Sequence, residues 1–230
     1  MSRTSAVVVA GGRSTRFGEH DKALAPVDGT PMLRRVADCL VPLVDELVVN
    51  CRRDQQPAFE DALDGCGLTP RFAVDHVPDQ GPVAGLRTGL RMAAGEVAIA
   101  VACDLPGVTT PLVGYLLSRA RATDAAAVVP STDGHRHPLC AAYDVAAARE
   151  ACSRVLARGD HRLCGVLTDL DPVVTVGDDA VAERAGPRAL ANVNTPADLD
   201  AIDAALSTDP PPSHRDSGAD TDGDAASPSL

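Results

Sequence analysis

Apolar residues occur along this chain in two patterns, short continuous runs and longer stretches in which they recur at helical spacing. The short runs of Val, Ala, Leu and Ile are typical of buried strands and lie at residues 6–10, 46–50, 71–74, 97–102, 126–129, 139–143 and 173–176. The longer stretches between them have helical spacing, as at Leu33, Val36 and Leu40. Strands that alternate with helices predict a three-layer α/β fold, with a mostly parallel sheet covered by helices on both faces.

Proline positions predict where three of the helices begin. Pro31 follows the turn Asp28-Gly29-Thr30, and Pro111 follows Thr109 and Thr110. Pro196 follows Thr195 in the same way. Proline is favoured in the first helical turn and threonine as the residue that caps it, so we expect helices to start at these points. The last of them should run through Leu206.

After residue 206 the composition changes to Asp, Pro, Ser, Gly and Ala, with almost no apolar side chains before the terminal Leu230. Such a segment cannot bury enough apolar surface to offset its ordering entropy. We therefore expect one domain over residues 1–206 and a disordered acidic tail over residues 207–230.

Charge, hydropathy and cysteine spacing argue against nucleic-acid partners, membrane association and disulfide bonds. The formal net charge is −11, which argues against nucleic acid as a partner. No apolar run is long enough to span a membrane, and the first residues do not have the pattern of a signal peptide. The seven cysteines have no C-x-x-C or zinc-ligand spacing, so they should be reduced thiols. We expect a cytoplasmic protein that does not associate with membranes.

Lys22 is the only lysine of the sequence, which otherwise uses arginine at twenty basic positions. It closely follows Gly11 and Gly12, which come directly after the first predicted strand. Ligands of such sheets bind beyond the carboxyl ends of the strands, and glycines allow backbone amides to approach a phosphate. The spacing is neither that of a Walker A loop nor that of a dinucleotide-binding loop. A tight connection without a ligand is the alternative interpretation.

Asp104 follows the apolar strand at 97–102, and Pro106 comes two residues later. Mg²⁺ that carries triphosphate oxygens usually takes one or two carboxylates and keeps several waters. Asp104 is therefore the candidate metal ligand. The alternative is an ordinary turn aspartate before a proline.

Together these motifs resemble the molybdenum cofactor guanylyltransferases, a MobA-like family with a Rossmann-like nucleotidyltransferase fold. The family opens with Leu-Ala-Gly-Gly-x-Ser-x-Arg-Met-Gly followed by Asp-Lys, which Val9 to Gly18 and Asp21-Lys22 match apart from Val9 and Phe17. The likeness covers residues 5–206 and continues through Val48-Val49-Asn50, Asp75, Gly81-Pro82-Val83-Ala84-Gly85, Cys103-Asp104-Leu105-Pro106, His137-Pro138-Leu139 and Asn192-Val193-Asn194-Thr195-Pro196.

The resemblance implies a nucleotide site and a Mg²⁺ cofactor. The implied nucleotide-binding residues are Val9, Ala10, Gly11, Gly12, Lys22, Asn50, Asp75 and Asp104. Asp104 would bind both GTP and Mg²⁺. A carboxylate such as Asp75 can accept hydrogen bonds from the N1 and 2-amino groups of guanine, a donor pair that adenine and cytosine do not present. The alternative for Asp75 is a loop residue that caps the following helix.

The resemblance also implies an acceptor side, without assigning a contact to each residue. Its candidates are Gly81, Pro82, Gly85, His137, Asn192 and Asn194. Arg16 of the glycine-rich loop joins Lys22 and Asp104 as a catalytic candidate, because its guanidinium can hold phosphate with two bonds. His135 and His137 have no evident third metal ligand, so His137 is expected to donate or accept hydrogen bonds. Residues 159–162 are either a phosphate-facing turn or an exposed helix start.

The implied reaction is transfer of GMP from GTP to the terminal phosphate of molybdopterin, with release of pyrophosphate. Transient contact with molybdoenzymes or other cofactor-biosynthesis proteins is implied as well. A nucleotidyltransferase of the same fold that uses CTP, or a sugar or other small phosphate, is the nearest alternative. A noncatalytic module that binds GTP or carries the cofactor is the alternative from another class, and the presence of both Lys22 and Asp104 argues against it.

Overall fold

One sheet runs through the computed structural model, which describes residues 3–13, 17, 21–77, 80–186 and 188–208. The strands lie in the order β10-β7-β9-β6-β1-β4-β5, with β8 (His135–Arg136) paired to β7. Their bounds are β1 Thr4–Val9, β4 Glu46–Cys51, β5 Arg71–Val74, β6 Val97–Ala102, β7 Ala127–Thr132, β9 Cys140–Asp144 and β10 Val173–Val176. All seven predicted strands are confirmed, three of them with the predicted bounds.

Most of the sheet is parallel, as predicted. β1 pairs in parallel with both β4 and β6, and β4 pairs in parallel with β5. β9 is the exception among the long strands, because it runs antiparallel to β6 on one side and to β7 on the other. The carboxyl ends of β1, β4, β5 and β6 therefore meet at one edge of the sheet, which is where ligands of such folds bind.

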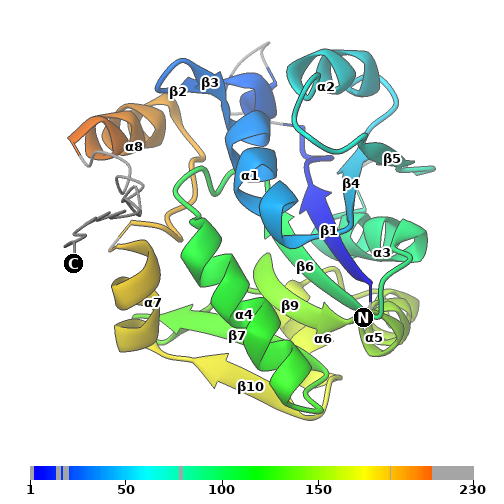
Figure 1. Ribbon diagram of the computed structural model, residues 1–230. Coiled ribbons are helices and arrows are strands. Elements are labelled where there is room, and N and C mark those ends of the chain that lie inside the picture. The colour runs from blue at the N-terminus through cyan, green and yellow to red at the C-terminus, as the bar shows by residue number, and fades with distance from the viewer. Residues whose placement is uncertain (1–2, 14–16, 18–20, 78–79, 187, 209–230) are drawn as a thin grey trace, which may run out of the picture.

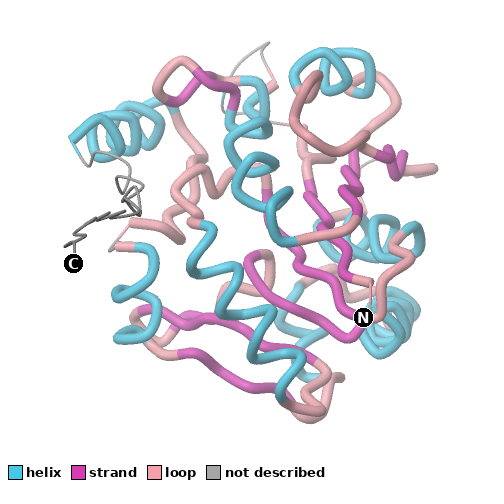
Figure 2. The backbone as a smooth tube through the Cα atoms, viewed as in Figure 1, coloured by secondary structure: helices cyan, strands magenta, loops and turns pink. Residues whose placement is uncertain are grey.

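Helices cover both faces of the sheet, so the three-layer arrangement is confirmed (Figures 1 and 2). The helices on one face are α1 (Met32–Leu40), α2 (Gln56–Ala62), α4 (Thr110–Ala122) and α7 (Asp178–Ala185). Those on the other are α3 (Pro82–Met92), α5 (Val145–Ala157) and α6 (Leu163–Thr168).

Side chains that alternate along the central strands form a separate core on each face. Val8 and Val49 belong to the core beneath α1 and α4, whereas their neighbours Val7 and Val48 belong to the core beneath α3 and α5. Successive side chains of a strand point to opposite faces, so a strand between two helical layers needs apolar residues at every position. This is why the central strands read as continuous apolar runs.

The helix starts follow the predicted prolines. Pro31 directly precedes α1, and Pro111 lies in the first turn of α4. The Thr109 hydroxyl accepts a hydrogen bond from the Leu112 N–H at 3.4 Å and so caps α4. The Thr195 hydroxyl accepts from the Asp198 N–H at 3.2 Å at the start of α8 (Pro196–Thr208).

The last helix packs away from the sheet on a small hairpin made of β2 (Pro26–Val27) and β3 (Thr30–Pro31). Ile202 of α8 contacts a buried cluster with Val27, Met32 and Val193. The helix ends at Thr208, two residues beyond the predicted limit of the domain. The remaining tail lies outside the described residues, and its disorder stays a prediction.

Two further features concern the expected environment of the protein. Within the described ranges, no helix is both long and apolar enough to cross a membrane. All seven cysteines belong to the described part of the chain, none forms a disulfide, and Cys164 alone among them is exposed.

Candidate active site

A cavity of about 410 Å³ opens at the carboxyl ends of β1, β4 and β6. Its walls come from the glycine loop after β1, from the segments after β5 and β6, and from the start of α3. Among the residues that line it are eleven of the predicted site residues: Val9, Ala10, Gly11, Gly12, Lys22, Asn50, Asp75, Gly81, Pro82, Gly85 and Asp104. The fold thus gathers segments between Val9 and Leu139 around one space.

Lys22 and Asp104 meet inside this cavity. Lys22 lies in the 3₁₀-helix η2 (Lys22–Leu24), and its Nζ donates a hydrogen bond to Asp104 Oδ2 at 2.7 Å. A second bond, of 3.0 Å, joins Lys22 Nζ to Oδ1 of Asn194. Both charged side chains are mostly buried, with 16% and 14% of their surfaces exposed. The predicted cation and acid therefore share one site.

The second carboxylate oxygen of Asp104 is available to accept a further bond. Its Oδ1 is buried and has no hydrogen-bond partner among the described residues. A buried carboxylate oxygen normally has a partner, and one that lacks it within the protein suits a ligand or a metal ion. The Asp104 backbone is fixed by a 2.9 Å bond from the Val193 N–H to its carbonyl, which also brings Asn194 to the site.

Asn50 and Asp75 form another part of the cavity wall. Asn50 Nδ2 donates to Asp75 Oδ1 at 2.8 Å and to the Ala73 carbonyl at 3.0 Å, and Asn50 Oδ1 is buried without a partner in the described chain. Gly81, rather than Asp75, precedes α3 as its N-cap, so the capping alternative for Asp75 is wrong. Asn50 instead holds one oxygen of Asp75 and orients the carboxylate.

Two glycines let the backbone pass close to this pair. A Cβ added to Gly11 would lie 2.7 Å from Asp75 Oδ2, and one added to Gly85 would lie 2.5 Å from Asn50 Oδ1. Both distances are shorter than real Cβ contacts allow, so any side chain at either position would push the pair out of place. Close packing against Asn50 and Asp75 is therefore the reason that glycine stands at both positions.

Three predicted residues of the described chain, His137, Asn192 and Asn194, do not line this cavity. Arg16 lies outside the described residues. Asn194 still reaches the site through its bond to Lys22, whereas Asn192 is exposed. His137 Nε2 is held 2.7 Å from the Thr132 hydroxyl.

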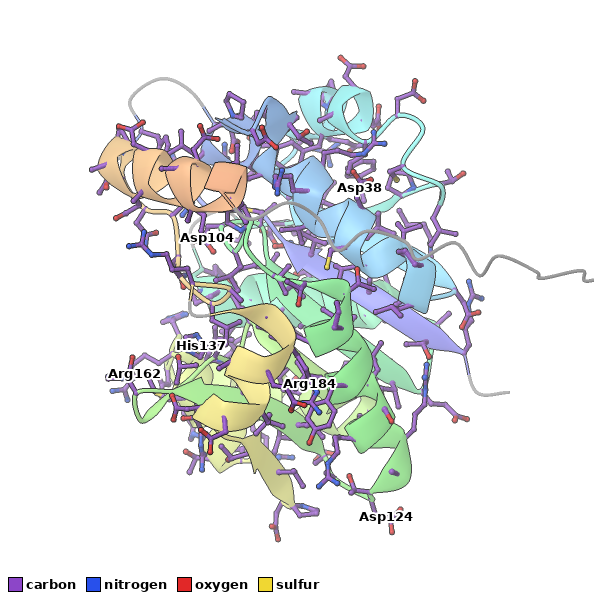
Figure 3. The ribbon with its side chains drawn as sticks, turned by 60° about the vertical axis from the view of Figure 1, so that its left-hand side comes forward. Asp38, Asp104, Asp124, His137, Arg162 and Arg184 are labelled. Carbon is purple, nitrogen blue, oxygen red and sulfur yellow. The ribbon has the colours of Figure 1, made fainter. Side chains whose placement is uncertain are left out.

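Burial, together with the nearby His135, lowers the pKa of His137, so its ring is neutral at lower pH than an exposed histidine. No cluster of three or more potential metal ligands occurs in the part of the chain that the structure describes. In Figure 3, His137 and Arg162 lie below Asp104 on one side of the view, while Arg184 lies away from them on α7.

The segment 159–162 is an exposed helix start, which is one of its two predicted alternatives. Arg162 directly precedes α6 and pairs with Asp160 at 3.0 Å, with 79% of its side chain exposed. His161 Nδ1 lies 2.8 Å from the carbonyl of Gln80, a residue of the cavity wall. It is an exposed helix start that also contacts the edge of the cavity.

Sequence reasoning missed two residues behind the glycine loop, Arg52 and Gln55. Both hydrogen-bond to carbonyl oxygens of that loop. They follow the strand that ends in Asn50 and Cys51, and polar residues at that strand end were the available signal. Cys51 itself is inert as a nucleophile, because burial and the neighbouring Asp75 raise the pKa of its thiol to about 12.

Comparisons with known proteins show which proteins this chain is similar to. The model of the MobA-like NTP transferase domain matches residues 6–173. A Natronomonas pharaonis protein named "Probable molybdenum cofactor guanylyltransferase" is 44% identical over 200 residues, which are 87% of this chain and 96% of the relative. The Yersinia pestis "Molybdenum cofactor guanylyltransferase" is 30% identical over 201 residues, or 84% of this chain and 92% of the relative.

A solved structure shares the fold. The crystal structure of molybdopterin-guanine dinucleotide biosynthesis protein A from Archaeoglobus fulgidus superposes with a TM-score of 0.72 and 22% sequence identity. The match covers 89% of this chain and 99% of that one. The Rossmann-like nucleotidyltransferase fold is thereby confirmed.

Proposed function

This chain belongs to the MobA-like NTP transferase family, and from that premise we propose that it transfers GMP from GTP to the terminal phosphate of molybdopterin. The observation that carries the proposal is the convergence of Lys22 and Asp104 in one cavity with the glycine loop. The names of relatives at 44% and 30% identity support the choice of substrates. The product would pass to molybdoenzymes or other proteins of cofactor assembly in the cytoplasm.

Asp75 is the residue that we assign to the base. Guanine presents two adjacent donors, its N1–H and 2-amino groups, which match the two oxygens of a carboxylate. Asn50 holds Asp75 from behind through a 2.8 Å bond, which limits rotation of the carboxylate. A base without that donor pair would leave a polar group unpaired, and this is the physical basis for preferring GTP.

Asp104 suits the Mg²⁺ that this chemistry requires. Its Oδ1 is a buried oxygen without a partner in the described chain and is available to a hard cation that needs few protein ligands. When bound, Mg²⁺ would neutralise charge on the phosphates of GTP. Lys22 would be shared between Asp104 and the phosphates, as a compact charge on a flexible stem.

The reaction needs no covalent intermediate on the protein. An oxygen of the molybdopterin phosphate forms a bond to the α-phosphorus of GTP, and the bond from that phosphorus to the bridging oxygen breaks. The electron pair leaves with pyrophosphate. The protein contributes by positioning the two phosphates in line and by stabilising negative charge through Lys22 and the loop amides, so no general base is needed.

We place the acceptor at the part of the cavity wall formed by Gly81, Pro82 and Gly85. These residues open α3, and the positive end of its helix dipole favours negative charge at this wall. Asn194 contributes by holding Lys22. Arg16 belongs to this proposal only through its place in the family motif.

The test is to incubate the protein with molybdopterin, Mg²⁺ and each nucleoside triphosphate in turn, and to measure pyrophosphate and the mass of the product. We expect pyrophosphate with GTP and the mass of a guanine dinucleotide. Faster release with CTP would assign the chain to cytidylyl transfer. Tight GTP binding without any pyrophosphate would support the noncatalytic carrier instead.

A further inference from the structure

Three consecutive carbonyls of the glycine loop are held by two side chains that do not line the cavity. Arg52 Nη1 donates to the Gly11 carbonyl at 3.2 Å and also to the Gly12 carbonyl. Gln55 Nε2 donates to the Ala10 carbonyl at 3.1 Å. We infer that Arg52 and Gln55 are positioning residues that aim the amides of this loop at the triphosphate of the nucleotide.

The geometry of the peptide bond carries the inference. In a planar trans peptide, the C=O of one residue and the N–H of the next point in opposite directions. Carbonyls 10, 11 and 12 are turned toward Arg52 and Gln55, so the N–H groups of Gly11, Gly12 and Arg13 are turned away from them. Those three residues line the cavity, whereas Arg52 and Gln55 do not.

Two of these N–H groups have no hydrogen-bond acceptor within the described part of the chain. No hydrogen bond among the described residues has the N–H of Gly11 or of Gly12 as its donor. Successive amides that point to one side form an anion-binding nest. An arginine is suited to hold such a loop, because one guanidinium can donate to two carbonyls at once and bonds from a charged donor are stronger.

The same two side chains also fix the start of the segment that carries Lys22. Gln55 Nε2 donates to Asp21 Oδ2, and Arg52 Nη2 lies 3.7 Å from that oxygen. The other oxygen of Asp21 accepts a 3.0 Å bond from the Ala23 N–H, which caps the 3₁₀-helix containing Lys22. Loop amides and lysine are therefore placed by one network.

Gln55 is itself fixed. It is 4% exposed, and its Oε1 accepts a 2.8 Å bond from the Arg52 N–H. The amide thus has both ends engaged and cannot turn without losing bonds. The inference rests on the proposed function, since it takes the ligand to be the triphosphate of GTP.

The experiment compares binding of GTP and of guanosine by titration calorimetry with Mg²⁺ and without acceptor. Arg52→Ala should weaken GTP binding by about 10- to 100-fold, the usual scale for losing charge-assisted hydrogen bonds. Guanosine has no phosphate, so its affinity should change by less than about threefold. Arg52→Lys keeps the positive charge but loses the planar guanidinium. It should weaken GTP binding less than Arg52→Ala does and leave guanosine binding nearly unchanged.

Arg53→Ala is the matched control. Arg53 is the next residue, is exposed, and makes no hydrogen bond or ion pair within the described chain. Equal GTP affinity in the Arg52 and Arg53 variants would overturn the inference, and so would equal losses for GTP and guanosine. Failure of the wild-type protein to bind GTP would instead refute the proposed function.

Discussion

Lys22 shows what one residue contributes to this site. It is the only primary ammonium among the side chains, and it reaches Asp104 and Asn194, which lie 82 and 172 positions later in the chain. An arginine could not replace it simply, because the planar fork is larger and would not follow a phosphate as a point charge does.

At this scale we predict that Lys22→Ala lowers turnover by about 10²- to 10³-fold, as expected for loss of one preorganised charge contact. The measurement is the rate of pyrophosphate release at saturating GTP. Unfolding temperature serves as the control, because a loss of folding would lower both. Turnover equal to that of the wild type would remove Lys22 from the mechanism.

Asp104 is the residue that we expect to bind Mg²⁺. Asp104→Asn keeps the shape but removes the charge that favours Mg²⁺, so the Mg²⁺ concentration for half-maximal rate should rise about tenfold or more. Asp38→Asn is the control, because Asp38 is a half-exposed carboxylate on α1 that pairs with Arg34. An unchanged Mg²⁺ titration in the Asp104 variant would contradict the assignment.

At the scale of elements, α3 approaches the sheet closely because it has small residues where it crosses β1 and β4. Gly85 faces Asn50 and Val9, and Gly89 faces Val7. The start of α3 forms part of the cavity wall, so the distance between this helix and the sheet affects the width of the site.

We therefore predict that Gly89→Ala destabilises the protein by about 1 to 3 kcal/mol, the usual cost of overpacking a core. The added Cβ would overlap with Val7 Cγ1. Gly177→Ala is the matched control, since nothing lies within 4 Å of a Cβ there and its φ is −80°. Denaturant unfolding measures both, and equal stability of the two variants would refute the packing argument.

At the scale of the whole molecule, Glu46 links the sheet to the loop that follows α3. It is 5% exposed, and it accepts hydrogen bonds of 2.5 Å from both the Ser5 hydroxyl and the Ala94 N–H. Arg71 and Arg3 lie 3.1 and 3.4 Å from its Oε2. Burial acts to raise the pKa of Glu46, but these hydrogen bonds and charges outweigh it and hold the pKa below its usual value of 4.5.

The lowered pKa makes a pH-dependent contribution to stability. A carboxylate with a lower pKa in the folded state stabilises the fold above its unfolded pKa, and the contribution is lost as pH falls through the folded value. We predict that Glu46→Gln lowers the free energy of unfolding by about 1 to 3 kcal/mol at pH 7. The difference from wild type should shrink below about pH 4.5.

Denaturant unfolding at several pH values measures this difference. Glu60→Gln is the control, because Glu60 is exposed on α2 and hydrogen-bonds to the neighbouring Gln56. A gap between Glu46→Gln and wild type that stays constant from pH 7 to pH 3 would contradict the prediction.

Local patterns in the amino-acid sequence determine much of this protein by themselves. Apolar runs such as 97–102 specify strands, and a proline after threonine specifies a helix start, because strand burial and helix capping act over a few residues. For the same reason Lys22 and Asp104 could be predicted to converge, since the carboxyl ends of parallel strands lie on one edge.

Tertiary structure decided what depends on contacts between distant segments. The sequence does not encode locally that β9 runs antiparallel, that Asn194 but not Asn192 reaches Lys22, or that His137 turns to Thr132. Arg52 and Gln55 gain their place only when β4 ends beside the glycine loop. These contacts depend on packing and on the need to pair buried polar groups between distant segments. They therefore produce no repeating pattern in the amino-acid sequence.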